Sequence, residues 1–195
     1  MGETLSKISS VLRLASEISE KDIQDYTKLT YLKRNDILNA YKMFKKLPSD
    51  DRFSDEISSM LTEDVKNALS ELRVGLFSDR IMRVFCGRKR RMSFEEFLSM
   101  LSIFSDACPQ HVKTEYAFRI YDFDEDNYLS ADDLRGLLNR QSGDKLNHEE
   151  IRVIIENIFE EMDEKRTGYM SIFDFKKMIS HCIRFSSSFR FLSVR

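Results

Sequence analysis

Apolar residues recur along most of the chain at steps of three and four, the spacing that puts them on one face of a helix. A polar loop follows Pro48 and a dense acidic loop begins at Asp122. We find no stretch with the two-residue alternation of a strand. The pattern predicts an all-α fold made of helix–loop–helix units. The predicted helices lie at 5–18, from Ser19 onward, at 31–47, within 57–76, and at 81–85, 94–104, 112–121, 131–140, 148–162 and from loop 163–174 to Cys182.

Two loops repeat one pattern, and their first residues, Asp122 and Asp163, are 41 positions apart. Loop position 8 is apolar in both, and loop position 12 is Asp in both. A weaker third copy lies at 92–97, where the sequence MSFEEF parallels MSIFDF at 170–175. Paired units of this kind meet through a short backbone pairing at position 8, so we predict that Leu129 pairs with Met170.

The repeat and a break at Pro109 predict two lobes of two units each. Residues 1–28 are predicted as an N-terminal helical extension, and residues 29–106 as an N-lobe whose two units are degenerate. Residues 107–182 are predicted as a C-lobe with loops 122–133 and 163–174, and residues 183–195 as an apolar tail.

The loop 122–133 resembles the calcium loop of EF-hand proteins. A hard cation needs about six or seven oxygens, and one tight loop must supply them. Position 6 normally takes glycine because the backbone φ is positive there, and Asn127 is the next best residue for that conformation. The predicted ligands are side-chain oxygens of Asp122, Asp124 and Asp126, the backbone carbonyl of Tyr128, Ser130 directly or through water, and Asp133.

The last ligand position bears on the identity of the cation. Asp133 stands where a calcium-selective loop usually has Glu, and the shorter side chain favours the six-coordinate shell of Mg²⁺. We predict one site, in the third unit, that takes Ca²⁺ or Mg²⁺, with a calcium affinity on the order of micromolar.

The other loops resemble the calcium loop in their position between helices but lack its ligands. In loop 163–174, Lys165 and Thr167 occupy positions 3 and 5, so we predict a structural loop without metal. Residues 88–91 are four consecutive bases, which would repel a cation; they form a solvated loop, a nuclear-import tag or a lipid-headgroup patch.

Composition narrows the class of protein. With 31 Lys+Arg against 33 Asp+Glu, the net charge of −2 argues against a strongly basic nucleic-acid binder. Only 6 Gly and 2 Pro argue against an all-β fold, whereas 15 Phe and 9 Met stand out. The three cysteines have no metal spacing and are predicted to be free thiols in a reducing cytosol.

The N-terminus bears on the cellular location. Gly2 and Ser6 fit the N-myristoylation pattern, although Glu3 directly after the glycine is a poor context for acyl transfer. The sequence shows neither a signal peptide nor an apolar run long enough to span a membrane. We expect a cytoplasmic protein at the inner face of the plasma membrane.

Three segments resemble the calcium- and integrin-binding (CIB) protein family: 93–106 (SFEEFLSMLSIFSD), 116–124 (YAFRIYDFD) and 185–189 (FSSSF). The order of the units also fits this family: two units without metal ligands come first, followed by a unit whose loop ends in Asp. The resemblance extends from about residue 24 to the end. The resemblance implies a non-catalytic adaptor that binds helical cytoplasmic segments of membrane proteins. Integrin α tails and the transmembrane channel-like subunits of mechanosensory channels are examples. This chain departs from the family in its fourth loop, since family members usually have two metal sites.

The apolar residues of the predicted C-lobe and tail suggest a groove for a partner and a tail that fills this groove. A pair of EF-hands can expose an apolar groove that accepts one face of an amphipathic helix. A free tail as apolar as residues 183–195 would promote aggregation, so we expect it to fold back as a plug. The predicted groove residues are Phe118, Leu134, Leu138, Ile155, Phe159, Met162, Phe173, Met178 and Ile179, and the predicted plug residues are Phe185, Phe189, Phe191 and Leu192.

Two other functions remain open. One is a constitutive structural subunit whose cation only rigidifies the C-lobe. The other is a regulatory subunit of a phosphatase or kinase, as in calcineurin B-like proteins. An enzyme is not expected, because His111, His148 and His181 stand apart from any Cys, Ser or Asp arrangement that suggests catalysis.

Overall fold

The computed structural model describes residues 18–46, 59–162 and 167–191. Within these ranges the chain forms helices joined by loops and two short antiparallel strand pairs, so the predicted all-α class is confirmed. None of the helices in these ranges is both long and apolar enough to cross a membrane. Gly2 and most of the predicted helix 5–18 lie outside the described residues.

The N-lobe contains two helix–loop–helix units joined by a strand pair. Strand β1 pairs antiparallel with β2, and Met60 lies opposite Met92. Its core includes the fully buried Ile37, Leu69 and Phe97, and the buried Ile23 of α2 joins them. The elements are α2 (Glu20–Leu29), α3 (Arg34–Lys46), β1 (Ser59–Leu61), α4 (Thr62–Ala68), α5 (Ser70–Arg73), α6 (Ser78–Cys86), β2 (Arg91–Ser93) and α7 (Phe94–Ile103).

The C-lobe repeats this plan. Strand β3 pairs antiparallel with β4, and Leu129 lies opposite Met170, which confirms the predicted pairing at loop position 8. Both residues are buried in the core between the two units. The elements are α8 (Gln110–Tyr121), β3 (Leu129–Ser130), α9 (Ala131–Ser142), α10 (His148–Met162), β4 (Tyr169–Met170), α11 (Ile172–Ser180) and the tail helix α12 (Phe185–Ser188).

Several helices begin with a capping box, which is a reciprocal pair of hydrogen bonds between a serine and an acid three residues later. The serine side chain accepts from the backbone N–H of the acid, and the acid accepts from the backbone N–H of the serine. This satisfies backbone donors that the first turn leaves free. The pairs are Ser19/Asp22, Ser93/Glu96, Ser130/Asp133 and Ser171/Asp174.

Two predicted helices have different bounds in the structure. The helix expected at 31–47 begins only at Arg34, after the backbone N–H of Lys33 donates to the Asp36 carboxylate at 2.9 Å. The apolar run 57–76 is divided into β1, α4 and α5, because Leu69 adopts an extended ψ of 116° between the two helices.

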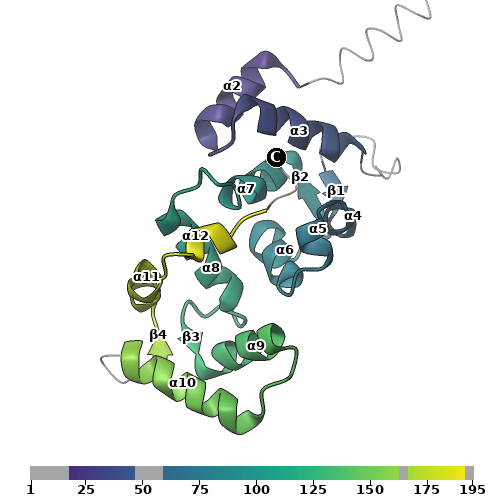
Figure 1. Cartoon of the computed structure of the whole chain (residues 1–195). Coiled ribbons are helices and arrows are strands. Elements are labelled where there is room, and N and C mark those ends of the chain that lie inside the picture. The colour runs from purple at the N-terminus through teal and green to yellow at the C-terminus, as the bar shows by residue number, and fades with distance from the viewer. Residues whose placement is uncertain (1–17, 47–58, 163–166, 192–195) are drawn as a thin grey trace, which may run out of the picture.

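Helix α8 lies between the lobes. Figure 1 shows α2 and α3 at one end of the molecule, α9 and α10 at the other, and α8 between them. Helix α8 packs against α6 and α7 of the N-lobe and against α9, α11 and α12. The C-terminal tail returns along this junction, so the lobes and the tail meet at α8.

Candidate metal centre

The third loop begins where α8 ends, at Asp122, and closes where α9 begins, after Ser130. The carboxylates of Asp122, Asp124 and Asp126 each offer an oxygen, and these oxygens lie within 4.8 Å of one another. Asp122 is buried, and the other two are exposed. Among the described residues, no other group of three His, Cys, Asp or Glu side chains brings ligand atoms together in this way.

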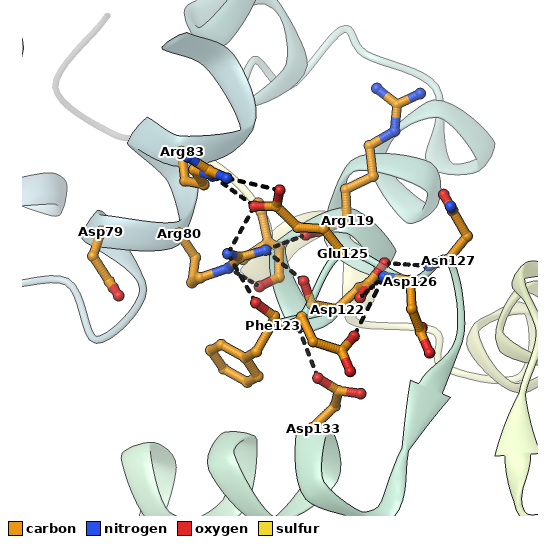
Figure 2. Close-up of polar contacts among 12 residues, drawn as sticks. Asp79, Arg80, Arg83, Arg119, Asp122, Phe123, Glu125, Asp126, Asn127 and Asp133 are labelled. Atoms are coloured by element: carbon orange, nitrogen blue, oxygen red, sulfur yellow. Dashed lines mark hydrogen bonds and ion pairs between the residues drawn. The ribbon is translucent and has the colours of Figure 1, made fainter. Parts of the chain in front are cut away.

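Backbone N–H groups of the loop hold these carboxylates in place (Figure 2). The Asp126 N–H donates to Asp122 Oδ1 at 3.2 Å and to Asp124 Oδ1 at 3.3 Å. The Asn127 N–H donates to Asp122 Oδ2 at 2.9 Å, and the Tyr128 N–H donates to Asp126 Oδ1 at 2.8 Å. Burial raises the pKa of the Asp122 carboxyl, although the backbone donors oppose this. Three hard oxygens fixed together in one loop fit the donor set that Ca²⁺ and Mg²⁺ prefer.

Two residues of the loop adopt a left-handed backbone. Asn127, at position 6, has a φ of 70°, which confirms the predicted turn. Glu125, at position 4, has a φ of 66°, which the sequence analysis did not predict. For a residue with a Cβ atom this conformation is unfavourable, so surrounding contacts must stabilise Glu125.

Asp133 is buried and faces the backbone rather than the three clustered carboxylates. Its Oδ1 accepts from the Phe123 N–H at 2.8 Å. Its Oδ2 accepts from the Ser130 N–H at 2.9 Å and from the Ser130 hydroxyl at 2.6 Å. The structure therefore brings Asp133 and Ser130 together with each other, but it does not bring Asp133 into the group of three.

The fourth loop is described from Thr167 onward; Asp163 and Lys165 lie outside the described residues. Gly168, at position 6, has a φ of 78°, so the turn of the motif is kept. The Thr167 hydroxyl donates to the Tyr169 carbonyl at 3.0 Å. That carbonyl is the position 7 ligand of a metal-binding loop, and here it accepts a hydrogen bond from a side chain of the same loop.

Two residues that the sequence analysis missed lie against the third loop. Arg83 on α6 forms two hydrogen bonds with the Glu125 carboxylate, with Nε–Oε1 at 2.6 Å and Nη2–Oε2 at 2.9 Å. Arg83 is the main cause of the low pKa of Glu125, about 2. Arg80, also on α6, donates to the same carboxylate at 3.3 Å. The sequence gives one signal for these bases: four of the first five loop residues are acids, and such a cluster is stabilised by positive charge nearby.

The predicted groove residues mostly form two adjoining apolar clusters of the C-lobe. Phe118, Leu134, Ile155 and Ile179 are buried, and Leu138, Phe159, Met162 and Met178 are partly buried against them. Phe173 differs, since 78% of it is exposed. It lies two residues before the buried Phe175 on α11, which places it on the opposite face of that helix. The structure thus does not bring Phe173 together with the others.

The tail packs at the junction of the lobes. The rings of Phe189 and Phe191 stack on the ring of Phe104, with centroids 4.6 and 4.1 Å away. Phe185 stacks on Phe189 at 5.5 Å, and both contact the C-lobe cluster that contains Phe118. Leu192 lies outside the described residues.

A buried lysine, also missed, holds the tail. Lys113 on α8 donates from Nζ to the Ser186 carbonyl at 3.2 Å and to the Phe189 carbonyl at 2.9 Å. These bonds compensate the ammonium for its loss of water.

Comparisons with known proteins agree with this arrangement. The family model described as "EF-hand domain pair" matches residues 112–180. Calcium and integrin-binding family member 2 of Drosophila melanogaster is 33% identical over 182 residues, which cover 88% of this chain and 94% of that protein. The human member 2 is 29% identical over 177 residues, with the same coverage. The mouse member 3 is 37% identical over 123 residues, which cover 63% of this chain and 77% of that protein. The chain therefore belongs to the calcium and integrin-binding protein family.

Proposed function

We propose that this protein is a non-catalytic adaptor that binds Ca²⁺ or Mg²⁺ at one site and binds a helical cytoplasmic segment of a membrane protein. The observation that carries the proposal is the convergence of three loop carboxylates within 4.8 Å. Asp122, Asp124 and Asp126 would hold the cation, with the Tyr128 carbonyl as a further oxygen. Ser130, directly or through water, and Asp133 would complete the shell; their side chains hydrogen-bond to each other in the capping box.

The partner half of the proposal rests on the names of the relatives, which specify integrin binding, and on the apolar clusters of the C-lobe. A helix that binds there would contact partly buried side chains such as Phe159 and Met178. The tail residues Phe185 and Phe189 already contact the same cluster, so the tail would compete with the partner as a plug. A membrane-protein partner would place the adaptor at the inner face of the plasma membrane.

Titration calorimetry with CaCl₂ and with MgCl₂ tests the cation site. The wild-type chain should bind one ion, and Asp124→Asn and Asp126→Asn should each weaken binding by about tenfold or more. Asp132→Asn is the matched control, because Asp132 is an exposed acid of the same segment whose carboxylate pairs with Arg135. Equal binding by all four proteins would contradict the proposed site.

The partner groove is tested by deleting residues 184–195. We expect the truncated protein to bind a peptide of an integrin α cytoplasmic segment more tightly and to bind more of a hydrophobic dye. Unchanged affinity and unchanged dye binding would show that the tail is not a plug.

A constitutive subunit is the second candidate function. It is favoured by the single cluster of candidate ligands among the described residues, because one site suits a structural cation better than it suits a two-site sensor. Equal partner binding in Ca²⁺, Mg²⁺ and chelator would support this alternative over a cation-responsive adaptor.

A further inference from the structure

Helix α6 of the N-lobe holds the end of α8, where the third loop begins. Arg80 is buried and directs its guanidinium at the last turn of α8. Carbonyls in this turn lack helical N–H partners, and a guanidinium offers five donors. Arg80 donates to the carbonyls of Ile120 and Phe123 at 3.3 Å, of Arg119 at 3.2 Å, and of Asp122.

The same helix holds the loop itself. Glu125 lies between the metal-ligand candidates Asp124 and Asp126, and its carboxylate accepts from both Arg80 and Arg83 (Figure 2). Glu125 is also one of the two loop residues with a left-handed backbone, with a φ of 66°. The two arginines therefore bind a residue that lies in an unfavourable conformation between two of the candidate ligands.

Helix α6 also holds the helix that leaves the loop. Arg140 on α9 forms a two-bond pair with the Asp79 carboxylate, at 2.7 and 2.9 Å. The Phe123 ring lies near both guanidiniums, 5.6 Å from Arg80 and 4.8 Å from Arg140. Both helices that flank the cation loop are thus bound to one helix of the other lobe.

We propose that Arg80 and Arg83 are positioning residues for the cation loop, so that cation binding and the stability of the N-lobe are coupled. The inference rests on the proposed cation site. If the N-lobe orders the loop for the ion, the ion must stabilise the N-lobe contacts by the same free energy.

Charge alone and a positioning role predict opposite changes in cation affinity when one of the two arginines is replaced. Both arginines carry positive charge close to the site, so charge alone would make their removal strengthen cation binding. A positioning role predicts that their removal weakens it, because the loop must then be ordered by the ion itself. The sign of the change therefore distinguishes the two roles.

The test is calorimetry of the full chain with CaCl₂ at about 0.15 M salt, an ionic strength that screens distant charges. Arg83→Gln should weaken binding by about five- to thirtyfold, the usual size of a coupling between sites. The double variant Arg83→Gln with Glu125→Gln keeps the net charge and should weaken binding similarly. Arg119→Gln is the matched control, because Arg119 is exposed and its side chain extends away from these contacts. It should leave the affinity unchanged or slightly higher.

Hydrogen exchange supplies a readout of the N-lobe. In the wild type, amides of α6 should exchange at least about fivefold more slowly in CaCl₂ than in chelator, and the double variant should lose this difference. The proposal is overturned if Arg83→Gln binds as tightly as Arg119→Gln, or if α6 exchange in the wild type is independent of Ca²⁺. Wild-type binding with no effect of the variants refutes the positioning role alone, whereas no wild-type binding refutes the cation site as well.

Discussion

Replacing Lys113 by Met tests how the tail is held at the junction of the lobes. Met has a similar length and is apolar, so it can fill the buried site on α8 without the ammonium. The change removes both donors to the carbonyls of Ser186 and Phe189. The stacking of Phe189 and Phe191 on Phe104 would remain as the main contact of the tail.

The size of the effect follows from these bonds. A hydrogen bond to a charged group contributes about 1.5–3 kcal/mol, so the two together contribute about 3–6 kcal/mol. Burial of the ammonium offsets part of this, and it also lowers the pKa of Lys113. We expect Lys113→Met to reduce the free energy of tail docking by about 2 kcal/mol, which raises the open population about 30-fold.

Native-state hydrogen exchange measures this opening directly. The Phe191 N–H donates to the Phe104 carbonyl at 3.0 Å, so it should be protected only while the tail is docked. Its exchange should become about 30-fold faster in Lys113→Met. Lys176→Met is the control, because Lys176 forms an ion pair with Glu115 that is partly exposed and worth about 0–1 kcal/mol. Unchanged exchange at Phe191, or an equal increase throughout α8, would refute the reasoning.

Three further changes test other contacts. Tyr26→Phe removes the hydroxyl that donates to Glu95 at 2.8 Å, and it should lower the free energy of unfolding in denaturant by about 1 kcal/mol. Burial and Glu95 raise the pKa of Tyr26 to about 12. The difference in stability should therefore persist to about pH 10 and disappear as the pH rises through 12. Asn127→Ala should weaken Ca²⁺ binding about fivefold in calorimetry, because Ala tolerates the φ of 70° poorly, whereas Asn127→Gly should not; equal losses would contradict this. Asp133→Glu should raise the Ca²⁺ affinity relative to the Mg²⁺ affinity, because the longer side chain can bind the cation with two oxygens and complete a seven-coordinate shell. An unchanged ratio in calorimetry would count against this.

The features that the sequence predicted correctly depend on neighbouring residues. The predicted helix start at Ser19 depends on a capping partner only three residues away, and the positive φ of Asn127 follows from its place in a short loop. The pairing of Leu129 with Met170 is long-range, but the repeat fixes its register. The strand pair of the N-lobe was missed because the first unit carries no ligand spacing that would mark its loop.

The contacts that the sequence did not predict join residues far apart in the chain. Glu125 is 42 positions from Arg83, and Lys113 is 73 positions from Ser186. No periodicity relates such residues, and their proximity depends on how α6, α8 and the tail pack together. Arg80 also belongs to a helix whose pattern predicts only an apolar face, yet it is buried because α8 presents carbonyls that need donors.

Helix α8 connects the candidate metal centre to the tail. Its 12 residues span about 18 Å, with Lys113 near one end and the Arg80 contacts at the other. A helix of this length moves as a rigid element, so a cation that fixes the end of α8 also fixes the surface on which the tail docks. We therefore expect Ca²⁺ to slow exchange at Phe191 in the wild type and to do so less in the Arg83→Gln variant. Exchange at Phe191 that is independent of Ca²⁺ would mean that the tail and the cation loop act separately.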